Sequence, residues 1–255
     1  MKSIKQIIAL VILILGLQDI QGQNRLDDQG RKSGPWRVEY PNGNPRYEAT
    51  FREGRPVGIM VRYYESGEVR VRMVFGSVQE DRSAAEMFYK SGKRAAGGIY
   101  LNRLKDSVWT YYSEYDGTVR LRENYLEGKL HGEATRLYPD GVVSEEIMWR
   151  EDSREGPWMQ YFEDGSIRLK GHYENNMLNG PYEVYFSNNT LMMSGIYLDN
   201  QSADTWSYYD DSGNLLYTLE YENGRPVDQE KYLQLMQDTL LRNDSIETPQ
   251  PFQPF

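Results

Sequence analysis

The chain has 255 residues, a formal net charge of -9, 21 tyrosines, 23 glycines and no cysteine. The acidic balance argues against partners that are held by a basic surface, namely nucleic acid and anionic membranes. The absence of cysteine excludes a disulfide scaffold, and the two histidines, His131 and His172, offer little to metal or nucleophilic chemistry.

Residues 1–22 have the features of a secretory signal peptide. Two lysines precede an apolar run, Ile7 to Leu17, which is too short for a stable membrane span of about 20 residues. Cleavage is expected near Gly22, and an uncleaved anchor is the alternative. The segment predicts an exported protein that is periplasmic, secreted or on the outer surface, with a linker over residues 23–33.

A turn signal recurs every 24 or 25 residues along the chain. The turn positions are Gly43, Gly67, Gly92, Gly117, Gly141, Gly165, Asn189 and Gly213. Each follows Asn, Asp or Ser, which predicts a two-residue type I′ hairpin turn. An aromatic residue stands eight positions after each of them: Phe51, Phe75, Tyr100, Tyr125, Trp149, Tyr173, Tyr197 and Tyr221. The pattern predicts eight β-hairpins over residues 34–227. The segments between successive strands are too short to contain helices.

Alternation within the strands predicts one apolar face, as in the run from Val69 to Phe75. A two-residue turn sets four cross-strand pairs that match a large side chain with a small one. They are Trp36 with Ala49, Trp158 with Gly171, Tyr182 with Gly195, and Ala134 with Ile147.

A second row of tyrosines is expected on the opposite face. The same register places Tyr63 opposite Arg70 and Tyr161 opposite Arg168. Packing along the sheet explains this row, and a platform for a protein segment or a glycan is the alternative. The candidate binding face is Tyr63, Arg70, Tyr161, Arg168, Tyr185 and Tyr209.

The run G-P-W-M-Q-Y-F-E-D-G at 156–165, followed by Tyr173, resembles the bacterial MORN-repeat variant family, some members of which are antitoxin-like. The resemblance covers about residues 31 to 228. It implies an all-β fold: an elongated, single-layer antiparallel sheet built as a meander of about eight β-hairpin repeats, with its ends covered. The copies around Gly92 and Gly117 depart from the motif, because Ser107 replaces the usual glycine and the stretch from Val78 to Ser83 lacks a glycine turn. A bulge or bend is expected there.

The C-terminal part predicts a capping helix over residues 228–242, with Asp228 as its N-cap. Its apolar face is expected to contain Tyr232, Leu233, Leu235, Met236 and Leu240. The proline-containing tail, residues 243–255, is expected to be disordered.

The sequence contains no catalytic set, no cofactor motif and no metal-ligand spacing. Both histidines are expected at the solvated surface, and acidic turn pairs such as Glu163-Asp164 are turn formers with weak Ca²⁺ binding as an alternative. The chain is therefore predicted to be a non-enzymatic scaffold for protein–protein interaction, without cofactor or metal. A carbohydrate- or peptidoglycan-binding module that uses the tyrosine face and an antitoxin or immunity-like inhibitor are the alternatives. The expected partner is a protein or a glycan, with no nucleic acid and no membrane after signal cleavage.

Overall fold

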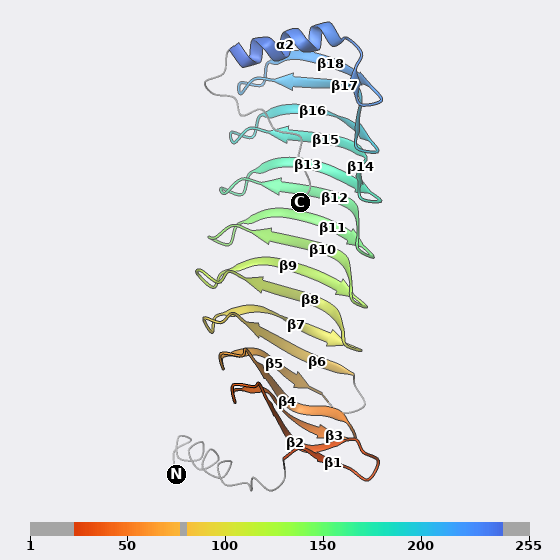
Figure 1. Cartoon of the computed structure of the whole chain (residues 1–255). Coiled ribbons are helices and arrows are strands. Elements are labelled where there is room, and N and C mark those ends of the chain that lie inside the picture. The colour runs from red at the N-terminus through yellow and green to blue at the C-terminus, as the bar shows by residue number, and fades with distance from the viewer. Residues whose placement is uncertain (1–22, 77–80, 242–255) are drawn as a thin grey trace, which may run out of the picture. The chain divides into compact units, whose positions relative to one another are not determined.

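The computed structural model describes residues 23–76 and 81–241, so the predicted signal segment, the predicted tail and Val78 lie outside the described residues. The chain divides into two compact units, unit 1 (Met1–Lys129) and unit 2 (Leu130–Phe255). Strands make up most of both (Figure 1).

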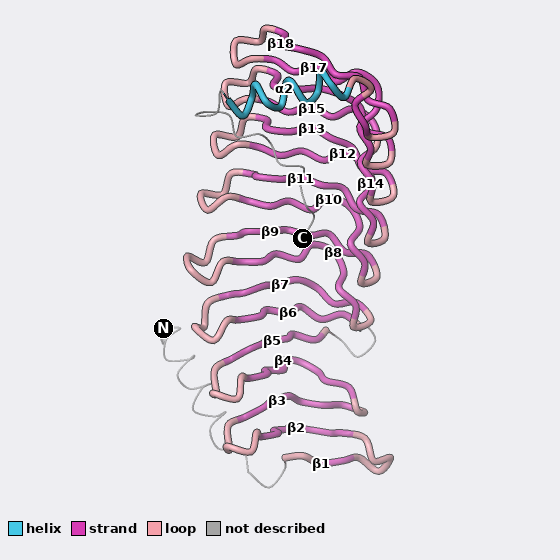
Figure 2. The backbone as a smooth tube through the Cα atoms, turned by 45° about the horizontal axis from the view of Figure 1, so that its top comes forward, coloured by secondary structure: helices cyan, strands magenta, loops and turns pink. Residues whose placement is uncertain are grey.

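Unit 1 is an antiparallel meander in which each strand pairs with its neighbours in sequence. Its strands are β1 (Arg25–Leu26), β2 (Lys32–Glu39), β3 (Pro45–Arg52), β4 (Arg55–Tyr63), β5 (Val69–Phe75), β6 (Arg82–Phe88), β7 (Arg94–Leu101), β8 (Leu104–Tyr112) and β9 (Val119–Leu126). Short loops join the strands at both of their ends (Figure 2).

Unit 2 repeats the same meander and ends in a helix. Its elements are β10 (Lys129–Leu137), β11 (Val143–Arg150), β12 (Ser153–Tyr161), β13 (Ile167–Glu174), β14 (Met177–Leu178), β15 (Gly180–Tyr185), β16 (Leu191–Leu198), β17 (Gln201–Tyr209), β18 (Leu215–Glu222), β19 (Arg225–Pro226) and α2 (Gln229–Leu241). The predicted fold class, an all-β antiparallel meander of β-hairpins followed by a C-terminal helix, is confirmed.

The turns at the recurring glycines differ from the prediction. In the second hairpin, the Tyr64 amide donates to the Glu68 carbonyl oxygen at 2.8 Å and the Gly67 amide donates to the Tyr64 carbonyl oxygen at 3.0 Å. This is a three-residue loop in which the last residue alone has positive φ, 104° at Gly67. The type I′ prediction is therefore wrong at these glycines. Where Asn or Asp precedes the glycine, its side chain forms an Asx-turn: the Asp140 carboxylate, for example, accepts the amide of Val142.

Type I′ turns occur at the other end of the strands. Glu53 and Gly54 both have positive φ, 51° and 78°, and the flanking residues Arg52 and Arg55 pair directly. Asn175 and Asn176 repeat the geometry with φ of 49° and 68°. Asparagine and glycine tolerate this left-handed backbone better than other residues do, which explains their presence at these positions.

The predicted register is confirmed in the strand interiors. Trp36 pairs with Ala49, Trp158 with Gly171, Tyr182 with Gly195, and Ala134 with Ile147. The register in the strand interiors is the predicted one although the turn type is not. A β-bulge follows each three-residue loop and offsets its additional residue, so the strands beyond the bulge pair as they would after a two-residue turn.

One face of each unit's sheet, which we call the tryptophan face, carries the core. Trp109 is 0% exposed and Trp206 is 2% exposed. The aromatic residues eight positions after the turns lie beside these rings, as in Tyr100 against Trp109, with ring centroids 4.9 Å apart, and Tyr197 against Trp206, with centroids 5.0 Å apart. Strand glycines provide the necessary room, since Gly195 lies directly under the Trp206 ring.

Tyrosines at the base of the three-residue loops tie successive hairpins together. In unit 1, the hydroxyl of Tyr40 donates to the Tyr63 carbonyl oxygen at 3.0 Å, and that of Tyr64 donates to the Phe88 carbonyl oxygen at 2.8 Å. In unit 2, Tyr138 makes the equivalent bond to the next hairpin. These aromatic positions therefore connect repeats through hydrogen bonds to main-chain oxygens.

The pairing of β5 with β6 differs from that of the corresponding strands of unit 1. The corresponding junctions, β3–β4 and β7–β8, shift register at a residue with positive φ, namely Gly58 and Ser107, whereas β5 and β6 pair without any shift. Of the two places where a bulge or bend was expected, the described residues therefore show a register shift at Ser107 and none at Ser83. Ser83 stands at the position of Gly58 but does not adopt positive φ, so the strand stays regular.

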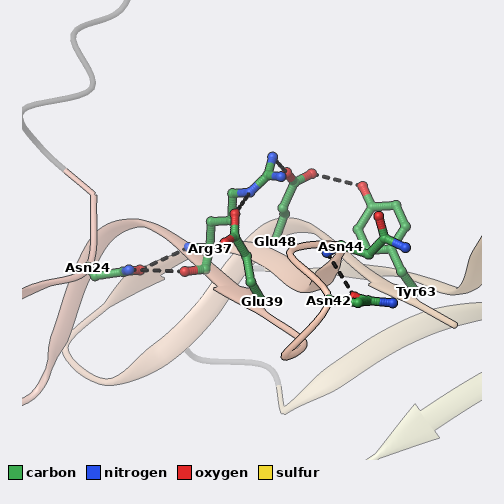
Figure 3. Close-up of polar contacts among 7 residues, drawn as sticks. All are labelled: Asn24, Arg37, Glu39, Asn42, Asn44, Glu48 and Tyr63. Atoms are coloured by element: carbon green, nitrogen blue, oxygen red, sulfur yellow. Dashed lines mark hydrogen bonds and ion pairs between the residues drawn. The ribbon is translucent and has the colours of Figure 1, made fainter. Parts of the chain in front are cut away.

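The N-terminal edge of the sheet in unit 1 is closed by a side chain. Strand β1 covers only two residues of β2. Beyond it, the Asn24 amide side chain accepts the Arg37 backbone amide and donates to the Arg37 carbonyl oxygen, both at 2.9 Å (Figure 3). Because an amide side chain offers both a donor and an acceptor, Asn24 acts as one further pairing residue on an otherwise open edge.

Replacing Asn24 should loosen this edge. We expect Asn24→Ala to cost about 1–2 kcal/mol, because two backbone groups of Arg37 lose their partners. Asn24→Asp should also destabilise the edge, since a carboxylate cannot donate to the Arg37 carbonyl. Urea denaturation and hydrogen exchange at the Arg37 amide measure both effects, with Gln29→Ala in the same segment as control. Unchanged protection of the Arg37 amide would contradict this role.

Helix α2 begins as predicted. The Asp228 carboxylate accepts the backbone amide of Lys231 at 2.9 Å, which is an N-cap bond. The Lys231 ammonium in turn donates to the Thr218 carbonyl oxygen, so the helix contacts β18. Tyr232 and Leu235 are half-buried, whereas Leu233 is 59% exposed and does not belong to the apolar face. The side chains of Met236 and Leu240 lie outside the described residues.

No helix in the described part of the chain is sufficiently long and apolar to cross a membrane.

Candidate binding surfaces

The face opposite the tryptophans, which we call the tyrosine–glutamate face, carries the predicted second row of tyrosines. In unit 1, the Tyr63 hydroxyl donates to one oxygen of Glu48 at 2.8 Å, and the other oxygen of Glu48 accepts from Arg37 at 2.8 Å (Figure 3). Burial, and then the adjacent Glu48 carboxylate, raise the pKa of Tyr63 to about 12. The ring is thus held in place by a charged network on the surface.

Unit 2 repeats this arrangement on successive hairpins. The Tyr161 hydroxyl donates to Glu146 at 2.7 Å, and its pKa is raised to about 12 by burial and by that carboxylate. Tyr185 donates to Glu183 at 2.6 Å and accepts from the Lys170 ammonium at 3.0 Å. The glutamates, which sequence reasoning missed as partners, follow from the strand alternation that places them on the same face as the tyrosines.

The predicted tyrosine–arginine pairs are not formed. Tyr63 pairs with Val69 and Tyr161 pairs with Ile167. Both tyrosines lie between the loop and the bulge, where the register differs by one residue from that of the strand interior. Arg70 instead lies over the ring of Tyr64, with 5.7 Å between its guanidinium carbon and the ring centroid.

The remaining predicted binding residues lie in unit 2. Arg168 is exposed, and it follows Ile167, the residue that faces Tyr161. Tyr209 is half-buried and pairs with Leu215, the position equivalent to Tyr161 with Ile167. Unit 2 therefore places Tyr161, Tyr185 and Tyr209 at matching positions of successive hairpins, without the expected arginine partner.

The tyrosine–glutamate face of unit 1 also carries an apolar stripe, which sequence reasoning did not identify. It consists of Ile59, Val74, Ala84 and Ile99, which pair in turn across β4, β5, β6 and β7. Ile59 is 59% and Val74 is 47% exposed. The signal in the sequence is a break of alternation: Ile59 and Val74 stand beside the inward-facing Met60 and Met73, where polar residues are expected.

A shallow depression of about 350 Å³ lies along this stripe. Val74, Ala84 and Ile99 contribute to its lining, and Gly97 leaves room on the same face. At its border, Glu86 forms ion pairs with Arg94 at 3.0 Å and with Arg72 at 3.7 Å. An apolar strip with a charged border is typical of a surface that receives a partner.

Metal chemistry finds little support in the described residues, among which no group of three or more His, Cys, Asp or Glu side chains could hold an ion. The acidic turn residues are used by the backbone, since Asp164 accepts the Ser166 amide at 2.8 Å. The prediction of a solvated His131 needs correction, because this residue is half-buried and its Nδ1 atom is buried without a hydrogen-bond partner among the described residues.

Comparisons with known proteins find the repeat. A family model described as the MORN repeat variant matches residues 32–53, 154–175 and 205–223. No curated protein matches the chain. Among solved structures, a mutant of S. aureus TarM in complex with fondaparinux, α-GlcNAc-glycerol and UDP is 9% identical, with a TM-score of 0.18. The alignment covers 80% of this chain and 24% of that one.

Proposed function

The chain belongs to the MORN-repeat variant family, and from that premise we propose that it is an exported, non-catalytic scaffold that binds another protein. The observation that carries the proposal is the apolar stripe Ile59, Val74, Ala84 and Ile99 in unit 1. Ordered, exposed aliphatic side chains in a row across four strands are costly in water and favour coverage by a partner. Their charged border supplies specificity.

The stripe gives the proposal a direct test. A photo-crosslinking residue placed at Val74 in the full-length protein should link to one defined partner, identified by mass spectrometry. Ile59→Lys should abolish this product, because it places a charge inside the apolar contact. Leu198→Lys, at an exposed strand position of unit 2 away from the stripe, serves as control. Absence of any defined product from position 74, or a product insensitive to Ile59→Lys, would refute the assignment of this surface.

Export is supported by the basic start and the apolar run of residues 1–22. Fusing residues 1–30 to a reporter that is active only outside the cytoplasm tests it. Reporter activity that disappears when Leu13 and Leu15 are replaced by Arg supports export. A fusion that stays inactive, beside an active control signal, would contradict it.

A glycan is the second candidate ligand. It is favoured by the tyrosine–glutamate pairs that repeat on successive hairpins of unit 2, because ring faces next to fixed carboxylates suit sugar rings and their hydroxyls. Tyr161→Ala, Tyr185→Ala and Tyr209→Ala combined should then abolish binding on a glycan array while the circular dichroism spectrum stays unchanged. Glycan binding that survives these substitutions would reject the tyrosine row as its site.

A further inference from the structure

On the tryptophan face, unit 1 carries a second depression, of about 400 Å³, that the proposed function does not use. Its lining includes Val71, Met73 and Phe75. Along β5 these residues alternate with Arg72 and Val74 of the other face, so this depression and the apolar stripe lie on opposite sides of the sheet. We call it the arginine groove, after the residues at its border.

The groove exists because two rings are missing from the repeat. The first hairpin has Trp36 two residues after the glycine near the start of its strand. The fourth hairpin has Ser107 in place of that glycine and has Trp109 two residues later. The second and third hairpins have Met60 and Ala85 at the equivalent positions, and both residues are buried. Since Met60 pairs with Met73 and Ala85 faces Met73 from the other side, the sheet there has an apolar floor without an indole cover.

Four arginines border this hollow: Arg55, Arg62, Arg82 and Arg103. All four are exposed, and Asp81 is the one acidic residue among the described residues of the lining, which gives these described residues a charge of 4 − 1 = +3 in a chain of net charge -9. This concentration of positive charge over an apolar floor is unlike the acidic balance of the whole chain. It favours an anionic ligand with an apolar part.

Some arginines elsewhere in the described residues are engaged by neighbouring side chains of the same chain. Arg37 pairs with Glu48, and Arg154 lies over Tyr173 with 4.3 Å between the guanidinium carbon and the ring centroid. The side chains of Arg62, Arg82 and Arg103 form no ion pair or ring contact with a described residue. Their guanidinium groups are thus available for carboxylates of another molecule, in the bidentate geometry that arginine favours.

We propose that the arginine groove binds an extended acidic segment of a partner protein, in which carboxylates flank a large apolar side chain. The carboxylates pair with Arg62 and Arg103 at the border. The apolar side chain fills the place of the missing indole and covers Met73, Phe75 and Tyr100. The floor and the charges together select such a segment over a purely acidic or a purely apolar one.

Selection of short random peptides displayed on phage, against the full-length protein, tests the proposal. We expect enrichment of sequences in which Asp or Glu residues flank Phe, Leu, Trp or Met. A selected peptide, labelled with fluorescein, should bind at least about tenfold more weakly to the double variant Arg62→Glu/Arg103→Glu, because each reversal places like charges in contact. Replacing the apolar residue of the peptide by Ser should weaken binding similarly, and added salt should weaken it progressively.

The matched control is Arg46→Glu/Lys90→Glu, which changes the net charge equally at exposed positions outside the groove. It should retain binding. Selection without acidic enrichment, or equal loss in both double variants, overturns the proposal. So does competitive binding of a peptide of residues 243–255, or arginine-dependent sedimentation with phosphatidylserine vesicles in the absence of peptide enrichment, because the occupant would then be the chain's own tail or a membrane. Crosslinking from Val74 reports on the opposite face, so the proposed function and this groove can fail independently.

Discussion

Gly195→Ala is expected to destabilise unit 2 by about 3 kcal/mol or more. A Cβ atom at this position would lie 2.2 Å from a ring carbon of Trp206, which is itself 2% exposed and has no space to retreat. The backbone cannot move either, since Gly195 pairs directly with Tyr182 in the neighbouring strand. A single methyl group therefore forces either the indole or the sheet out of position. Urea denaturation followed by tryptophan fluorescence measures the loss.

The cause can be separated from an effect of glycine itself. In the double variant Gly195→Ala/Trp206→Leu, the added methyl group no longer meets a ring, so the cost of Gly195→Ala should fall to within about 1 kcal/mol of the Trp206→Leu background. Ser194→Ala, at the preceding position and on the other face, should change stability little. A cost of Gly195→Ala below about 1 kcal/mol in the otherwise unchanged protein would contradict the close packing of this face.

The protein is expected to unfold cooperatively as the pH rises from 10 to 12. A tyrosine in an unfolded chain ionises near pH 10, whereas the native pKa of Tyr63 and of Tyr161 is raised to about 12 by burial and by Glu48 and Glu146. Below pH 10 both states are protonated and the stability is complete. Between pH 10 and 12 the unfolded state loses protons that the native state retains, so the free energy of unfolding falls with pH.

Burial raises further tyrosine pKa values in the same direction, including those of Tyr182 and Tyr208 in unit 2. Circular dichroism and the absorbance of tyrosinate at 295 nm should therefore change together. The combined variant Tyr63→Phe/Tyr161→Phe should flatten the decline, because two of the linked groups are gone. Tyrosine absorbance that titrates near pH 10 while the sheet signal stays intact would show that these hydroxyls are not protected by the fold.

The repeat and the strand register were predictable because they depend on local chemistry and on volume. An aromatic residue at a constant offset from a turn glycine determines where the hairpins begin, and the pairing of Trp158 with Gly171 follows from matching a large side chain to a small one. The turn type was not predictable in the same way. Asp140 and its equivalents are compatible with both turn classes, and their hydrogen bonds to the second following amide decide between them.

The binding surfaces could be predicted only in part. The alternation of β4 correctly placed Tyr63 on the face opposite the tryptophans, the tyrosine–glutamate face. The partner of its hydroxyl, however, is Glu48 of the preceding hairpin and not Arg70. That contact depends on which strand lies on the other side, a property of the sheet and not of the hairpin. The arginine groove had a sequence signal that was not used: Met60 and Ala85 interrupt the series that includes Trp36 and Trp109.

The tyrosine hydroxyl bonds between hairpins have a consequence for how such a chain changes its length. The Tyr138 hydroxyl bonds to the carbonyl oxygen of residue 161, and residue 185 occupies the same place one hairpin later. Excision of residues 157–180 would join Gly156 to Pro181 and present Tyr138 with an equivalent acceptor, because only main-chain oxygen is recognised. Removal or insertion of one whole hairpin at this junction therefore leaves the hydroxyl bond of Tyr138 intact.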